Sequence, residues 1–242
     1  GCLMRTVVTE DARELARVGA EIILEAAREA LRERGRFAIA LTGGTSPRLL
    51  YQQLAASPND HEWSRWEFFL GDERFVPESD PRSNLRGARE NLLSRVAVAE
   101  SRVHPMYAPD ADVHEAARRY ERVLTEVLGE APVFDLVLLG VGRDAHTLSL
   151  HPGCEAIREE ARAVVGLPDP PMDPAVARVT LTPPVVARAR RVLVILAGAD
   201  KADAARYVLQ APDNRMKFPA QIIRDARGEV TVLLTRDAAP TA

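Results

Sequence analysis

One short apolar run constrains the fold of this chain more than any other feature. Residues 134–139 are almost wholly apolar, and the run breaks at Gly140-Val141-Gly142. A run of this length and character is typical of a parallel strand buried on both faces. Similar runs at 37–41, 66–70 and 192–197 alternate with longer segments of helical periodicity. This alternation predicts an α/β fold, with a Rossmann-like, mostly parallel sheet and helices on both faces.

The remaining elements follow from periodicity and from helix-end signals. Helices are expected at 11–34, 47–54, 84–95, 113–128, from 183 onward and at 201–209. Gly35 should end the first helix, and Ser46 should cap the second ahead of Pro47. Further strands are expected at 103–107, 178–181 and 230–234, and a Pro-rich loop at 167–174. We expect residues 1–242 to form a single domain.

Composition narrows the classes of protein and partner. Apolar residues make up 46% of the chain and charged residues 28%, as in ordinary water-soluble globular proteins. No apolar run approaches the roughly 20 residues needed to cross a bilayer and no signal sequence is evident, so we expect a cytoplasmic protein. The net charge of −3 argues against nucleic-acid binding but leaves a small anionic substrate open. Cys2 and Cys154 are too few for a disulfide framework and are interpreted as free thiols.

Ligands of such sheets bind beyond the carboxyl ends of the strands, so the residues that follow each strand matter most. The segment Gly43, Gly44, Thr45 and Ser46 follows the strand at 37–41 and begins a helix. Its backbone N–H groups and the helix dipole favour a phosphate, although a simple tight turn is the alternative. The segment matches neither the Walker loop nor the dinucleotide fingerprint.

Charged residues follow the strand at 66–70. Asp72, Glu73 and Arg74 come directly after it, and Arg82, Ser83 and Asn84 lie downstream. Carboxylates beside an arginine can hold its guanidinium toward an oxyanion. The alternative interpretation is a solvated turn with a surface ion pair.

A lysine follows the strand at 192–197. Lys201 is one of only two lysines among 32 cationic side chains, and it lies where a helix is expected to begin. A cation there opposes the helix dipole, which suggests that Lys201 neutralises an anion such as a phosphate. A solvated lysine is the alternative.

The loop after the central strand carries a candidate general base. His146 lies two residues after Asp144 in a glycine-rich segment. Imidazole titrates near neutral pH, and a carboxylate can fix its tautomer, so the pair suits proton abstraction. A purely structural histidine is the alternative. No G-x-S-x-G elbow and no metal-ligand spacing is present, which disfavours serine nucleophiles and zinc chemistry.

Taken together and in this order, the motifs resemble those of the 6-phosphogluconolactonases, whose fold is shared with glucosamine-6-phosphate deaminases. The matching segments are 41–51, 69–77, 80–84, 134–153, 178–183 and 198–201. The resemblance implies hydrolysis of 6-phosphoglucono-1,5-lactone to 6-phosphogluconate in the oxidative pentose phosphate pathway, with neither cofactor nor metal. It also implies a phosphosugar lactone as partner, no contact with nucleic acid or membrane, and a monomer or small homo-oligomer.

The resemblance also implies roles for individual residues. His146 matches the general base, Arg74 an active-site arginine and Asp72 a carboxylate that orders the site, with Asp144 beside the base. The expected substrate and phosphate ligands are Gly43, Gly44, Thr45, Ser46, Arg82, Ser83, Asn84 and Lys201.

Two residues depart from the family pattern. Ala145 stands where the family usually has glycine, and it would strain the loop if its φ were positive. His151 stands where phenylalanine is usual, which could place a second titratable group near His146. Two other functions stay open: a sugar-phosphate isomerase-deaminase, and an inactive sugar-phosphate-binding domain.

Overall fold

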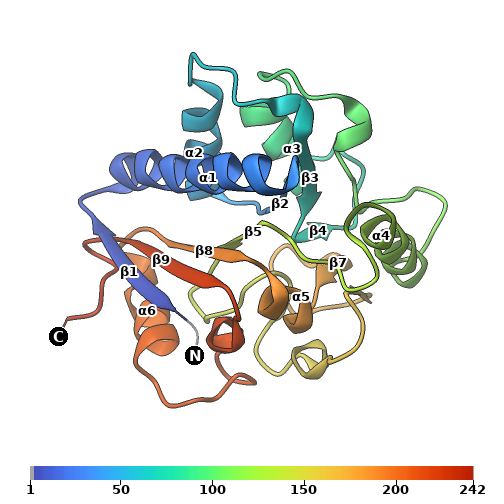
Figure 1. The fold of residues 1–242 in the computed structure, drawn as a ribbon. Coiled ribbons are helices and arrows are strands. Elements are labelled where there is room, and N and C mark those ends of the chain that lie inside the picture. Colours follow the sequence, from blue (N-terminus) through green and yellow to red (C-terminus); the bar gives the residue numbers. More distant parts are fainter. Residues whose placement is uncertain (1–2, 242) are drawn as a thin grey trace.

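A six-stranded sheet forms the centre of the computed structural model, which describes residues 3–241 (Figure 1). All of its strands pair in parallel. In sheet order they are β1 (Met4–Thr9), β9 (Glu229–Thr235), β8 (Arg191–Leu196), β5 (Leu136–Gly140), β2 (Phe37–Leu41) and β3 (Trp66–Leu70). Every residue of β2 is buried, as are the first four of β5, so the apolar runs lie where the sequence predicts.

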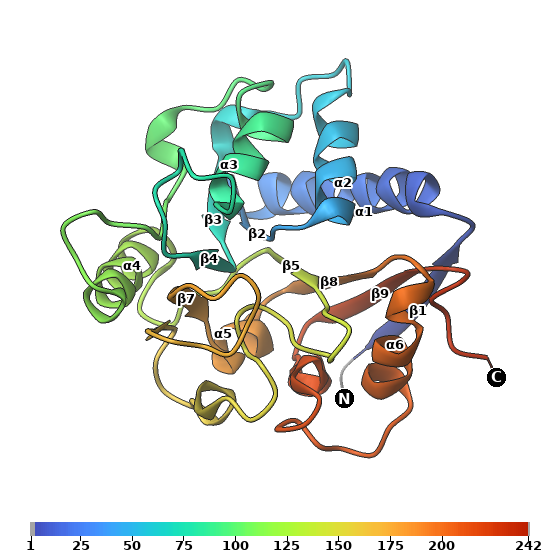
Figure 2. The same cartoon turned by 180° about the vertical axis from the view of Figure 1, so that it is seen from behind.

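Helices cover both faces of this sheet, which confirms the predicted fold class. On one side lie α1 (Ala12–Arg34), α2 (Thr45–Ala55) and α3 (Asn84–Ala88), and on the other α5 (Pro183–Arg188) and α6 (Ala202–Leu209) (Figures 1 and 2). The remaining helix, α4 (Val113–Leu128), packs against a second, smaller sheet. No helix in residues 3–241 has the length and apolar character needed to cross a membrane.

The second sheet was not predicted. It is antiparallel and consists of β4 (Asp72–Arg74), β7 (Arg178–Leu181) and β6 (Val164–Leu167). Its central strand β7 lies where a strand was expected at 178–181. The other two were missed because β4 is three charged residues long and β6 contains a glycine. The edge strand β1 was also missed, since polar residues interrupt its apolar ones.

Two local predictions were wrong. The expected strand at 103–107 is a single bridge between Val103 and Phe68. Ser46 does not cap α2, because the helix begins at Thr45 and Gly44, with φ of 114°, occupies the cap position. The end of α1 is as expected, with Gly35 in the left-handed conformation at φ of 73°. Cys154 is a buried free thiol, and Cys2 lies outside the described residues.

Two buried tyrosines fasten the carboxyl ends of β2 and β3. The Tyr51 hydroxyl, from α2, accepts the N–H of Thr42 at 2.9 Å and donates to the carbonyl of the same residue at 2.6 Å. The Tyr120 hydroxyl, from α4, likewise accepts the N–H of Leu70 at 2.9 Å and donates to the carbonyl of His104. Each helix thus fixes the point where a strand gives way to its loop.

Replacing Tyr51 with phenylalanine should lower the free energy of unfolding by about 1–2 kcal/mol, because two backbone groups of Thr42 lose a buried partner. Urea denaturation measures the change. Tyr207→Phe is the matched control, since the Tyr207 hydroxyl makes no such bond to any of residues 3–241, and it should cost less than about 0.5 kcal/mol. Equal losses in the two variants would contradict the role given to Tyr51.

Candidate active site

A cavity of about 540 Å³ opens at the carboxyl ends of β2, β5 and β8. Its volume suits a small polar ligand. It brings together most of the residues predicted from sequence, namely Gly43, Gly44, Thr45, Ser46, Asp72, Arg74, Asn84, His146 and Lys201. Asp144, Arg82 and Ser83 do not line it. The strand ends therefore meet as the parallel topology predicts.

Asp144 orients the imidazole of His146. Its Oδ1 lies 2.6 Å from Nδ1 of His146 and also accepts the backbone N–H of His146 at 3.0 Å. Burial raises the pKa of Asp144, but the hydrogen bonds and charge of His146 outweigh it and the net shift is downward. An ionised carboxylate at Nδ1 requires the proton on that nitrogen, which leaves Nε2 as a proton acceptor.

The turn that carries His146 is strained at Ala145. This residue is fully buried and has a φ of 65°. Its backbone is therefore in the left-handed conformation, in which an alanine is strained. Its N–H donates to the carbonyl of Gly142, and the N–H of Gly142 donates to the carbonyl of His146, both at 2.9 Å. A Cβ on Gly142 would lie 2.1 Å from Nδ1 of His146. The tight turn thus makes room for the ring, at a strain of about 1 kcal/mol or more.

Ala145→Gly should change the free energy of unfolding by less than about 1 kcal/mol. Relief of left-handed strain offsets the lost methyl burial and the added chain entropy. Ala226, which is similarly buried with φ of −59°, is the control, and Ala226→Gly should cost roughly 1–2 kcal/mol. Equal costs in denaturant titrations would show that Ala145 carries no strain.

Three loops interlock around Asp72. Its Oδ2 accepts the Ser149 hydroxyl at 2.7 Å, and its backbone carbonyl accepts the side-chain amide of Asn84 at 3.1 Å. A Cβ on Gly43 would lie 2.1 Å from Oδ1 of Asn84, so this position requires glycine. Asp72 therefore joins the loops that follow β3 and β5, and Asn84 packs against the loop that follows β2.

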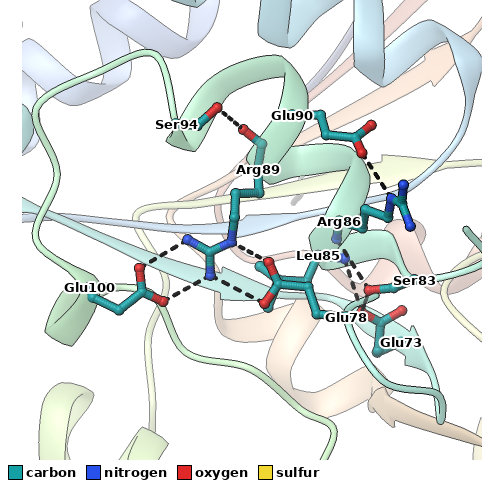
Figure 3. Close-up of polar contacts among 9 residues, drawn as sticks. All are labelled: Glu73, Glu78, Ser83, Leu85, Arg86, Arg89, Glu90, Ser94 and Glu100. Carbon is teal, nitrogen blue, oxygen red and sulfur yellow. Dashed lines mark hydrogen bonds and ion pairs between the residues drawn. The ribbon is translucent and has the colours of Figure 1, made fainter. Parts of the chain in front are cut away.

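Glu73 anchors the segment that begins α3 (Figure 3). Its carboxylate is 2% exposed and accepts the Ser83 hydroxyl at 3.0 Å and the N–H groups of Asn84 and Leu85 at 2.7 and 2.9 Å. The N–H of Arg74 is a fourth donor, at 2.8 Å. Burial raises the pKa of Glu73 to about 7, against these donors, which favour the charged form.

Glu73 should make stability fall as pH rises. Because the folded pKa of about 7 exceeds the ordinary 4.5, its stabilising contribution is complete below pH 4.5 and is lost as pH passes 7. Wild type should lose up to about 3 kcal/mol relative to Glu73→Gln across this window. Denaturation at a series of pH values measures the slope. Ser83→Ala keeps the titrating group and should keep the slope, whereas equal slopes in wild type and Glu73→Gln would contradict this account.

Arg82 and Ser83 hold the loop rather than line the cavity. The guanidinium of Arg82 pairs with Asp80 at 2.7 Å, while its carbonyl accepts Nη1 of Arg74 at 2.9 Å. Ser83 accepts the N–H of Arg86 at the start of α3 and lines only a smaller adjoining hollow. After α3 the chain continues as a short π-helix, in which Arg89 pairs with both Glu78 and Glu100 (Figure 3).

Arg178 lines the cavity, although it is not among the site residues predicted from the sequence. It lies opposite Arg74 across the β4–β7 pair, so the two side chains share one face. Its Nη2 donates to the carbonyl of Pro174, but its buried Nε has no partner among residues 3–241. Burial lowers the pKa of Arg178. An arginine inside the apolar stretch at 176–181 was the signal available in the sequence.

Lys201 completes a basic group with Arg74 and Arg178. Its Nζ donates to the carbonyl of Val141 at 2.7 Å, and burial lowers its pKa. Two arginines and a lysine around one cavity suit an anion such as a phosphate. His151 does not line the cavity, and its Nδ1 contacts the carbonyl of Pro152. Among residues 3–241, no three His, Cys, Asp or Glu side chains gather as a metal site would require.

The fold and the cavity define an α/β protein with a carboxylate-oriented histidine in a cavity that two arginines and a lysine also line. A family model described as glucosamine-6-phosphate isomerases/6-phosphogluconolactonase matches residues 10–232, and the chain belongs to this family. The 6-phosphogluconolactonase of Mycobacterium tuberculosis is 39% identical over 217 residues, which are 87% of each chain. That of Streptomyces coelicolor is 36% identical over 244 residues, covering 96% of this chain and 92% of the relative.

Solved structures agree with this assignment. The 6-phosphogluconolactonase of Trypanosoma brucei superposes with a TM-score of 0.85 at 30% identity, over 98% of both chains. A monomeric glucosamine-6-phosphate deaminase shares the fold, with a TM-score of 0.80 at 23% identity over 98% of both chains. The predicted family and fold are confirmed.

Proposed function

We propose that this chain hydrolyses 6-phospho-D-glucono-1,5-lactone to 6-phospho-D-gluconate, with His146 as the general base. Relatives at 36–39% identity over most of the chain carry the name 6-phosphogluconolactonase. The observation that supports this mechanism best is the His146–Asp144 pair, which leaves Nε2 of a cavity-lining imidazole able to accept a proton. The same cavity holds Arg74, Arg178 and Lys201, as an anionic sugar requires.

The reaction is a single proton relay around a water molecule. Nε2 of His146 takes a proton from water as the oxygen attacks the lactone carbonyl carbon. The tetrahedral intermediate then expels the ring oxygen, and the imidazolium returns the proton to it. Water is the only co-reactant and nothing is oxidised or reduced, so the chemistry needs no cofactor.

The cationic groups divide into two tasks. Lys201, Arg178 and the amide groups at the start of α2 would hold the 6-phosphate. Arg74 would stabilise the developing oxyanion, held in place by the carbonyl of Arg82 and opposite Arg178. Asp72 would order the loops around the sugar through Ser149 and Asn84.

The substrate is a free small molecule of the oxidative pentose phosphate pathway. On this proposal the chain acts in the cytoplasm, as a monomer or small homo-oligomer. An isomerase-deaminase is disfavoured because 6-phosphogluconolactonases match this chain at 36–39% identity, whereas a glucosamine-6-phosphate deaminase matches at 23%.

His146→Ala should lower kcat for the lactone by roughly 100-fold or more, because the step loses its base. The rate is measured above spontaneous hydrolysis. His151→Ala is the matched control, since this neighbouring histidine lies outside the cavity lining, and its rate should equal that of wild type. Equal lactone rates in wild type and His146→Ala would overturn the mechanism. Ammonia release from glucosamine 6-phosphate without lactone hydrolysis would overturn the function.

A further inference from the structure

A second cavity, of about 590 Å³, lies at the amino ends of β8 and β9, the edge of the sheet opposite the candidate active site. The carboxyl ends of α1 and α5 border it. Charged side chains of both signs line it, namely Arg34, Arg188, Arg190, Arg191, Arg227, Glu29, Glu33, Asp135 and Glu229. Five arginines face four carboxylates, so the charges do not cancel.

Three of the five arginines form ion pairs with the four carboxylates of the lining. Arg34 pairs with Glu33 at 2.9 Å and with the buried Asp135 at 2.8 Å. Arg190 also reaches Asp135, at 3.6 Å. Arg191 pairs with both Glu29 and Glu229. Every carboxylate in the cavity lining therefore already has a cationic partner.

Arg188 and Arg227 are the two arginines of this lining that form no ion pair with residues 3–241. Within residues 3–241 neither side chain has a carboxylate within ion-pair distance, and the Nε of Arg188 is buried without a hydrogen bond. The N–H of Arg227 donates to the carbonyl of Ala187 at 2.9 Å, which places Arg227 next to the residue that precedes Arg188. Burial and the charge of Arg227 both lower the pKa of Arg188. Two uncompensated like charges in one hollow are unfavourable unless an anion lies between them.

A buried arginine Nε without a hydrogen bond is also found at the candidate active site. In the part of the chain that the structure describes, only two buried side-chain nitrogen or oxygen atoms lack a hydrogen-bond partner, the Nε atoms of Arg178 and Arg188. A buried donor without a partner is costly, so each one in a native protein calls for a cause, and an ion bound beside the guanidinium is one such cause. Arg178 lines the cavity proposed to take a phosphosugar, and Arg188 lines the second cavity.

We propose that the second cavity binds a small phosphate-bearing anion between Arg188 and Arg227. The two terminal nitrogens of the Arg188 guanidinium would donate to two phosphate oxygens, and Arg227 would bind a third. Arg227 is exposed, so the ligand can reach the site from solvent. The cavity is large enough for a phosphorylated metabolite rather than an ion alone.

The test is binding of inorganic phosphate to Arg178→Gln, in which the guanidinium of the other cavity is removed. The Nε–H signal of Arg188 in a ¹H–¹⁵N spectrum, assigned by its loss in Arg188→Gln, reports on this site directly. It should shift with a roughly millimolar dissociation constant at fixed ionic strength. Adding Arg227→Gln should weaken that binding about tenfold.

A charge-matched control separates a site from a general loss of positive charge. Arg118 is exposed on α4, far from the cavity in sequence and absent from its lining, so adding Arg118→Gln should change the phosphate affinity less than about twofold. No shift of the Arg188 signal with phosphate would overturn the proposal, as would equal weakening by the Arg227 and Arg118 replacements. Binding of citrate without binding of phosphate would overturn the assignment to phosphate.

Stability distinguishes a ligand-binding arginine from a structural one. Arg188 ends α5, where a cation can also favour the negative end of the helix. If that were its role, Arg188→Met would unfold at a lower temperature than wild type in every buffer. Without phosphate, we expect Arg188→Met to have a melting temperature at least as high as that of wild type. As phosphate is added, the melting temperature of wild type should rise relative to that of Arg188→Met. A lower melting temperature with no phosphate dependence would overturn the site.

Discussion

The sheet is buried on both faces, and this one constraint decides where chemistry can take place. The side chains of β2 are all buried, and those of β5 and β8 nearly so, because helices pack on each side. Polar side chains in these strands would lose water without gaining partners. Charged and catalytic groups are therefore confined to the two edges of the sheet, where the strands end or begin.

The site is as well ordered as it is because its loops bind one another. Asp72 joins Ser149 to Asn84, and Glu73 collects four donors from the start of α3 and from Arg74. The bond between Ser149 and Asp72 connects segments 77 residues apart in sequence, and the others fix the loop between β4 and α3. They place Arg74 and His146 around one cavity through buried hydrogen bonds, whose loss is costly because water cannot replace the missing partner.

The sequence was informative where a residue's role depends on its own strand and loop. Gly43, Asp72, His146 and Lys201 each follow an apolar run, and parallel topology alone brings them together. It failed where a role depends on pairing with a distant segment. Arg178 faces Arg74 only because β4 and β7 pair, and no local periodicity announces a three-residue charged strand. Arg82 lies outside the cavity lining for a local reason, since its guanidinium pairs with Asp80 two residues away.

The two arginines with unpartnered Nε atoms stand at opposite ends of one short segment. Arg178 begins β7, and Arg188 ends α5, which follows β7 after a single residue. An anion at either end would fix one end of the same strand-helix unit, and energetic coupling between sites requires a shared element that both ligands bias. Since coupling is reciprocal, an anion that orders α5 from the second cavity would change the affinity of the first by the same factor that a phosphosugar changes the second. An anion bound at Arg188 is therefore connected, through α5 and β7, to the cavity that Arg178 lines ten residues earlier in the chain.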